Sequence, residues 1–223
     1  MDLKTYFLLF IIYSIIGWTL EVISSFFQKR RFVNRGFLIG PYCPIYGFGG
    51  IFLLIFLEKY IHDPLILFFM SIFIFSVLEY FTSYLMEKMF KTRWWDYKKF
   101  KFNINGRICL EMMAVFGALG LFAMYFVNPF IIGILNSMNE NLKLILSIVI
   151  FILFLIDTIT SYKIISNFKK IVKFSLKDNT EEITKIVKEV LLNKTLFYRR
   201  LVDAFPFFKL SFMGKKSDKN RRN

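Results

Sequence analysis

The chain has 223 residues, of which 56% are hydrophobic and 20% aromatic, and its net charge is +14. The apolar residues come in runs of about twenty, which is long enough to cross the hydrocarbon core of a bilayer. A soluble domain would distribute its charges throughout. The composition therefore excludes a soluble enzyme and a disordered basic protein, and we predict an all-α, polytopic protein of the lipid bilayer.

Residue types and motifs that are rare or missing in the sequence exclude several classes of site. His62 is the single histidine, so we expect neither a His-rich metal site nor a Ser-His-Asp triad. The sequence lacks a G-x-x-x-x-G-K-[ST] motif, so any ATP must be bound by another subunit. Cys43 and Cys109 lack the C-x-x-C spacing of redox and zinc motifs. We expect no cofactor and no metal.

Five apolar segments are expected to cross the membrane. They cover residues 5–27, 41–57, 64–86, 108–127 and 144–166. The stretch 128–141 is too polar, and too interrupted by Pro129 and Gly133, to form a further span. We therefore predict a transmembrane helical domain over residues 1–166 and a cytoplasmic basic tail over residues 167–223.

The distribution of Lys and Arg predicts the orientation of these segments. Basic residues are concentrated in the first and third connections and in the tail, whereas the second and fourth connections contribute only Lys59 and Lys143. Because basic loops stay on the cytoplasmic side, we predict an inner-membrane protein with its N-terminus outside and its C-terminus in the cytoplasm.

The basic tail contains a predicted amphipathic helix. Apolar residues recur at helical spacing over residues 183–201, with lysines on the opposite face. Such a tail can bind anionic lipid or a partner protein, or act only as a positive-inside anchor. Nucleic acid is not an expected partner, because the charge borders membrane spans and no recognition motif accompanies it.

Acidic residues inside the spans are the sharpest functional signal. Four of the five segments carry one in their predicted cytoplasmic half: Glu21, Glu79, Glu111 and Asp157. Each costs about 2.5–3.5 kcal/mol near the centre of a spanning helix, so such groups usually have partners and often a role. We expect the four acids to meet in one polar cavity that opens to the cytoplasm. The alternative is that each separately reaches headgroup water.

Cationic and polar side chains that could partner these acids are predicted at the same depth in the membrane. Arg35, Arg93 and Arg107 can pair with a carboxylate or bind a phosphate. Arg107 and Glu111 are four residues apart, so they can also simply pair with each other. The other candidates for a substrate pathway lie on the same helix faces or in the polar connections: Cys43, Tyr46, Tyr80, Ser83, Asp96 and Asn103.

Two connections have unusual compositions. Residues 34–47 contain two prolines and three glycines where the second span should begin, which predicts a broken or re-entrant start of the kind that lines transporter sites. A kinked helix start is the alternative. Trp94 and Trp95 predict an interfacial aromatic belt. A belt does not explain Asp96 and Asn103, which can cap short helices or reach the polar site from below.

Several motifs occur in a characteristic order: 13-YS-14 with 17-GW-18 and Glu21, 34-NRG-36, 40-GP-41, 43-CPIYG-47, 79-EY-80 with 82-TS-83, 93-RWWDY-97 and 105-NGRICL-110. Over residues 5–165 the chain thereby resembles the small bacterial membrane proteins of the CmpB-like family of ABC-transporter type IV permeases. The resemblance implies a multi-pass inner-membrane permease. It departs at Lys98, Met113 and Phe116, and the tail lies outside it.

The leading hypothesis is therefore a permease-like subunit that works with a separate ATPase subunit and forms a homodimer, because five spans enclose little volume. One alternative is a membrane-embedded enzyme acting on a lipid or isoprenoid phosphate. In that case carboxylates would hold Mg²⁺ or act as acid and base, while arginines hold the phosphate. The other alternative is a regulatory or scaffold subunit.

Overall fold

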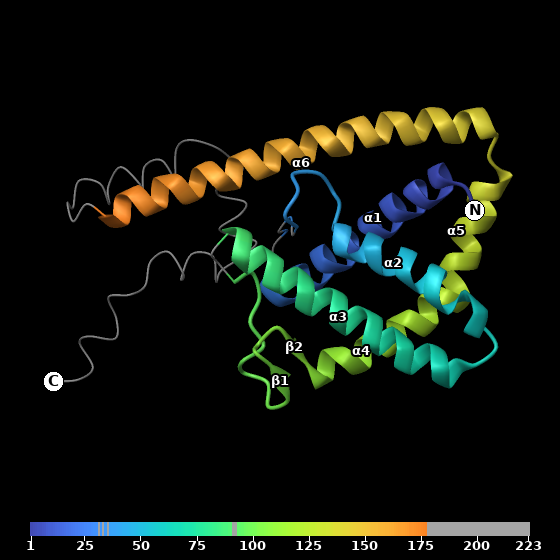
Figure 1. Ribbon diagram of the computed structural model, residues 1–223, viewed down its shortest axis with the longest axis horizontal. Coiled ribbons are helices and arrows are strands. Elements are labelled where there is room, and N and C mark those ends of the chain that lie inside the picture. Colours follow the sequence, from blue (N-terminus) through green and yellow to red (C-terminus); the bar gives the residue numbers. More distant parts are fainter. Residues whose placement is uncertain (31, 33, 35, 91–92, 178–223) are drawn as a thin grey trace.

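The computed structural model describes the backbone of residues 1–30, 32, 34, 36–90 and 93–177, and the side chains of all of these except 28, 29 and 167–177. The regular secondary structure of this part of the chain is helical apart from one short hairpin (Figure 1). Its elements in chain order are α1 (Leu3–Lys29), α2 (Pro44–Leu57), the 3₁₀ turn η1 (Glu58–Tyr60), α3 (Pro64–Phe90), β1 (Asn103–Ile104), β2 (Ile108–Cys109), α4 (Leu110–Phe122), the π-helical turn η2 (Ala123–Val127), α5 (Asn128–Ser137) and α6 (Glu140–Lys177).

Four helical stretches of the described residues are long and apolar enough to cross a bilayer: Leu3–Phe27, Pro64–Phe90, Leu110–Ser137 and Glu140–Ser166. They coincide with the first, third, fourth and fifth predicted segments, and they make the chain an all-α, multi-pass membrane protein. α1, α3 and α6 run from right to left, α4–α5 runs back between α3 and α6, and the shorter α2 runs back between α1 and α3 (Figure 1).

The second predicted segment is the exception. α2 begins at Pro44 instead of residue 41 and has 14 residues, so it is about 21 Å long at 1.5 Å per residue. That is shorter than the hydrocarbon core of about 30 Å, so α2 is not by itself a full-length spanning helix, although it returns the chain between α1 and α3 (Figure 1). The residues that precede it, 36–43, form bends instead of a helix, because Pro41 and Pro44 each remove a backbone donor.

The fourth span extends to Ser137, beyond its predicted end at residue 127, and residues 128–141 form no further span of their own, as expected. α4 continues through η2 into α5, which makes one helical stretch of 28 residues. Pro129 is accommodated in the first turn of α5, directly after the wide π-helical turn. At this turn Asn128 is buried, and its Oδ1 accepts a 2.6 Å hydrogen bond from the Tyr13 hydroxyl of α1.

Glycines bring α1 and α2 into close contact. A Cβ on Gly47 would lie 2.6 Å from the backbone oxygen of Phe10 and 2.4 Å from the Ser14 Oγ, and a Cβ on Gly17 would lie 2.1 Å from the Tyr46 ring. Small residues allow helix backbones to approach in lipid, where dispersion contacts drive association. This packing places the start of α2 directly beside the middle of α1.

The long helix α6 lies at the edge of the bundle (Figure 1). Most of its apolar side chains face outward, as suits a lipid-facing helix. It is joined to α1 near its start, where Glu140 pairs with Lys4 and with Lys143. Its backbone continues as helix past residue 166, the predicted domain boundary, to Lys177. The predicted tail helix 183–201 lies outside the described residues.

Candidate functional site

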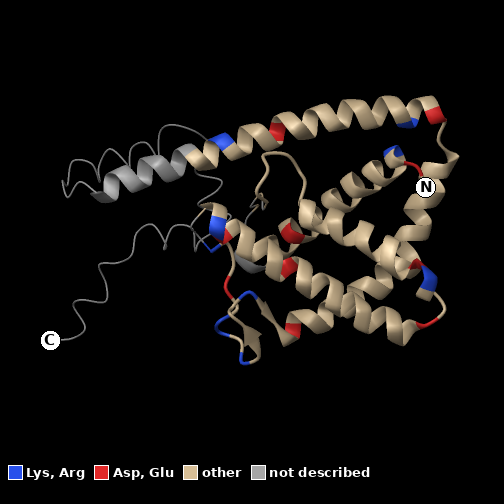
Figure 2. Ribbon diagram, viewed as in Figure 1, with Lys and Arg blue, Asp and Glu red and all other residues tan. Residues whose placement is uncertain are grey.

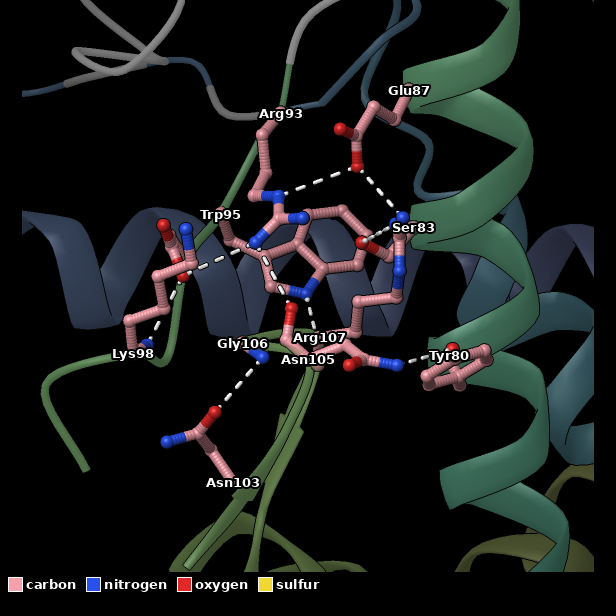
Figure 3. A network of polar contacts seen from close by, with 11 residues as sticks. Tyr80, Ser83, Glu87, Arg93, Trp95, Lys98, Asn103, Asn105, Gly106 and Arg107 are labelled. Carbon is pink, nitrogen blue, oxygen red and sulfur yellow. Dashed lines mark hydrogen bonds and ion pairs between the residues drawn. The ribbon is translucent and has the colours of Figure 1, made fainter. Parts of the chain in front are cut away.

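The connection between α3 and α4 folds back along one face of α3 (Figure 3). Hydrogen bonds and ion pairs join the two at Glu79, Tyr80, Ser83 and Glu87, which share that face at spacings of one, three and four residues. The returning chain supplies Tyr97 to the first, Asn105 to the second, Arg107 to the third, and both Arg107 and Arg93 to Glu87.

A tight hairpin gives the connection its shape. Asn105 and Gly106 have φ of 53° and 67°, and a side chain at Gly106 would also meet the Asp96 carboxylate. Asn103 Oδ1 accepts from the Gly106 amide at 2.9 Å, and Asp96 Oδ1 accepts from the Lys98 amide at 3.0 Å. Asp96 and Asn103 therefore form turns inside the connection.

Arg107 is the buried cation of this region, with 9% of its surface exposed. Its Nη2 lies 2.8 Å from the Glu87 carboxylate, and its Nη1 donates to Ser83 Oγ at 3.2 Å. The Arg93 Nε lies 3.3 Å from the same Glu87 oxygen (Figure 3). Arg107 thus pairs with Glu87 instead of Glu111, which is exposed at the start of α4.

The two tryptophans pack inward. Trp94 is 4% exposed, and its ring contacts the rings of Phe37 and Phe90. The Trp95 Nε1 donates to the Arg107 carbonyl at 3.2 Å. The expectation of an interfacial belt is therefore wrong for Trp94, because the ring lies inside the fold and anchors the connection against α3.

Deeper in the bundle, Tyr97 reaches Glu79, and its hydroxyl donates to Glu79 Oε1 at 2.9 Å. On the other side, the Tyr46 hydroxyl of α2 donates to Glu21 Oε1 of α1, also at 2.9 Å. Glu21 acts electrostatically on both Glu79 and Tyr97. These four residues, Glu21, Tyr46, Glu79 and Tyr97, are called the buried acid cluster below. Figure 2 shows acidic positions on both α1 and α3.

Glu79 and Tyr97 are both poorly solvated. Glu79 is 9% exposed, and its Oε2 has no hydrogen-bond partner. Burial, reinforced by the Glu79 carboxylate, raises the pKa of Tyr97 well above its usual range. The phenol therefore remains a hydrogen-bond donor throughout the physiological pH range.

Asp157 lies apart from the buried acid cluster and fastens a different segment. Its Oδ1 accepts from the Ile39 amide at 2.9 Å and from Ser161 Oγ at 2.8 Å, and its Oδ2 accepts from the Gly40 amide at 2.7 Å. The irregular chain before α2 is thus attached to α6 by the carboxylate. At the end of this chain the Cys43 amide donates to the Ser14 carbonyl of α1 at 2.8 Å.

The structure thus brings together some of the predicted site residues and separates others. Glu21, Tyr46 and Glu79 form one cluster, and Tyr80, Ser83, Arg93 and Arg107 lie beside it. Asp157 and Glu111 lie elsewhere, and Arg35 lies outside the described residues. The substrate pathway itself stays a prediction. Tyr97 and Glu87 were not predicted as site residues, although the 93-RWWDY-97 motif and the α3 face contain them.

A cavity elsewhere in the bundle is apolar. A cavity of about 350 Å³ between α1 and the α4–α5 stretch is lined by apolar side chains, including Ile12, Phe126 and Ile131. Within the described part of the chain, no three His, Cys, Asp or Glu side chains are grouped as a metal ion would require.

One family is found by comparison with known proteins. The model of the family described as "Putative ABC-transporter type IV" matches residues 8–162. This range includes the buried acid cluster, the hairpin and Asp157, and it omits the tail. No curated protein and no solved structure shows a significant match to the chain.

Proposed function

The chain belongs to the ABC-transporter type IV family, whose model covers well over half of it, and from this membership we propose that it is the permease-like membrane subunit of an ABC-type transport system. The sequence has no nucleotide-binding P-loop. Hydrolysis of ATP is therefore assigned to a separate ATPase subunit, and the substrate pathway to this chain.

The observation that supports a pathway is the buried acid cluster. Its members come from α1, α2, α3 and the returning connection, so it lies where four parts of the fold meet. Ionisable side chains inside a membrane domain are costly and mostly mark routes for polar substrates or ions. The cluster also adjoins the irregular residues 36–43, and interrupted helices of this kind form the binding sites of many transporters.

The proposed mechanism is alternating exposure of this cluster to the two sides of the membrane. The irregular segment 36–43 is the proposed moving part, because it is held at one end to α6 through Asp157 and at the other to α1 through Cys43. A dimer would provide the enclosed volume that a single bundle lacks.

The proposed orientation has the N-terminus outside and the tail in the cytoplasm, where an ATPase would bind. Reporter fusions test it. An alkaline phosphatase fused before residue 1 should be active, and one fused after Lys177 should be inactive. The reverse pattern would contradict the orientation and would place the basic connections outside the cell.

The association with an ATPase is tested by purifying the tagged full chain from its native membranes in mild detergent after cross-linking. We expect an ATP-binding-cassette ATPase to copurify and to hydrolyse ATP in a vanadate-sensitive manner. An unrelated multi-pass protein with the same tag and expression level is the control. Recovery of no nucleotide-binding subunit above this control would refute the proposal.

The hypothesis of an enzyme acting on a lipid phosphate finds no support in the contacts of the arginines. Its candidate phosphate ligands are Arg35, Arg93 and Arg107. Arg35 lies outside the described residues, and the guanidinium groups of the other two are held by Glu87. A phosphate would have to displace this carboxylate before either arginine could bind it.

A further inference from the structure

The Glu79 carboxyl group lies in an unusual position for an ionised acid. It is eleven residues before the end of α3, which corresponds to about 16 Å along the helix axis. One of its oxygens accepts from Tyr97, while the other is buried and has no hydrogen-bond partner. A buried carboxylate with an unsatisfied oxygen is strongly disfavoured in apolar surroundings.

Among the described residues, the groups that face Glu79 do not provide a positive charge to offset this cost. They are Glu21 from α1, Tyr46 from α2, Tyr97 from the connection and Cys109 from β2. Within the described residues, the charged group that acts on Glu79 is Glu21, which is itself an acid.

The hairpin arginine that contacts α3 at Ser83, and the acids of α4 and α6, also have other partners or lie elsewhere. Arg107 lies one turn away, at Ser83, and its charge is taken up by Glu87. Glu111 of α4 is exposed, and Asp157 of α6 is bound to the amides of Ile39 and Gly40. None of these groups donates to the unpaired oxygen of Glu79.

We propose that the buried acid cluster is a proton-binding site in which Glu79 holds one exchangeable proton on Oε2, beside the carboxylate of Glu21. Protonation of one of two carboxyl groups that act on each other in a poorly solvated site avoids the repulsion of two negative charges. The Tyr46 and Tyr97 hydroxyls each donate to one carboxyl, so they stabilise the remaining negative charge of the pair.

The composition of the cluster favours a proton over a metal cation. A calcium ion takes six to eight oxygen ligands, and no three acid, His or Cys side chains of the described residues are grouped to begin such a shell. The two phenols already direct their protons at the carboxyl groups. A proton needs only one free carboxyl oxygen, and Glu79 Oε2 provides it.

The position of Tyr97 makes the returning connection a cover over the bound proton. The connection is fastened to α3 by Arg93 and Arg107 through Glu87, and Tyr97 closes the cluster on that side. Exchange of the proton therefore requires this connection to loosen or the irregular segment before α2 to move. The inference goes beyond the proposed transport function, because proton binding is measured without a substrate.

The test is infrared difference spectroscopy of the full-length protein in lipid nanodiscs during a pH titration. We expect the carbonyl stretching band of a protonated carboxyl group at neutral pH, and we expect it to disappear at high pH with the loss of one proton per chain. Glu79→Gln should abolish this band, while Glu58→Gln, which changes an exposed acid at the far end of α2, should leave it intact.

Two results would overturn the proposal. One is the absence of a protonated-carboxyl band at neutral pH, or a band that Glu79→Gln does not change. The other is loss of the band when sodium chloride replaces choline chloride at constant pH, which would identify a sodium site instead. If Glu79→Gln does not fold, labelling of the wild-type protein with dicyclohexylcarbodiimide, which modifies protonated carboxyl groups in apolar sites, assigns the band to Glu79 or to another acid. The band is expected even if the chain transports no substrate, so this test is independent of the proposed transport function.

Discussion

Tyr97 is the residue that connects the α3–α4 connection to the centre of the bundle, through its hydrogen bond to Glu79. Tyr97→Phe leaves both Glu79 oxygens without a donor, and the expected loss is about 1–3 kcal/mol of unfolding free energy. Thermal unfolding in detergent measures it. Tyr84→Phe is the matched control, because the Tyr84 ring lies against Arg107 and Phe retains that ring. Equal losses in the two variants would contradict the role given to the Tyr97 hydroxyl.

The same phenol predicts a pH dependence. The pKa of Tyr97 is raised by burial and by Glu79, so the folded chain keeps this proton above pH ~10, where the unfolded chain releases it. The unfolded state then binds fewer protons than the folded state, and stability falls as the pH rises. Denaturation curves should show a smaller decline above pH ~10 in Tyr97→Phe than in the wild type, and parallel declines would exclude this titration.

Arg107 is expected to be the most important cation for the fold of the connection. Because Glu87 is about one-third exposed, we discount the usual cost of breaking a buried pair and expect Arg107→Ala to cost about 1–3 kcal/mol. Arg93→Ala should cost less, since the Arg93 contacts are longer. Both are measured by thermal unfolding. A smaller loss for Arg107→Ala than for Arg93→Ala would show that the Ser83–Glu87 contacts are not the main ones.

At the scale of elements, glycine sets the distance between α1 and α2. A Cβ on Gly47 would meet the Phe10 carbonyl, which cannot move independently of its helix. Gly47→Ala should therefore cost about 1–3 kcal/mol through overpacking. Gly133→Ala is the control, because it is also helical and has open space around it. Its better helix propensity should make it neutral or stabilising by up to about 1 kcal/mol. Similar thermal stabilities for the two variants would refute the close packing.

The chain before α2 should depend on α6 for its order. Asp157→Ala removes the acceptor of the Ile39 and Gly40 amides, and hydrogen bonds to a charged acceptor contribute about 1.5–3 kcal/mol. We expect these two amides to exchange with deuterium at least tenfold faster in Asp157→Ala. In Thr160→Ala, which loses an exposed bond within α6, they should exchange as in the wild type. Unchanged exchange in both would show that Asp157 does not hold the segment.

The elements show where prediction from the sequence succeeds. Helical spacing correctly placed Glu79, Tyr80 and Ser83 on one face, because that depends on neighbours a few residues away. Helical spacing could not predict which segment packs against this face of α3. The hairpin that carries Arg107 reaches the face because two turn residues have positive φ and because Trp94 is buried. Such contacts depend on how the whole chain packs. Arg107 therefore pairs with Glu87 instead of Glu111, which is nearer to it in the sequence.

At the scale of the whole molecule, the spans could be predicted because each is a long apolar run that has no other way to satisfy its backbone in lipid. Two departures have local causes. α2 is shorter than a full-length span because prolines delay its start to Pro44. The α4–α5 stretch passes Pro129 through a π-helical turn, and Tyr13 stabilises this turn by donating a hydrogen bond to Asn128. The prediction that all four acids meet depends on the rotation and tilt of each helix, which residue spacing does not determine. Asp157 and Glu111 lie outside the buried acid cluster.

The central claim is that the buried acid cluster lies on the route of a transported substrate. The most direct measurement compares the metabolites of cells and medium, by mass spectrometry, in a strain lacking the gene and in strains that express the wild type, Glu79→Gln or Glu58→Gln at equal levels in the membrane. The account predicts a compound whose distribution across the membrane is restored by the wild type and by Glu58→Gln but not by Glu79→Gln. Full restoration by Glu79→Gln would contradict it.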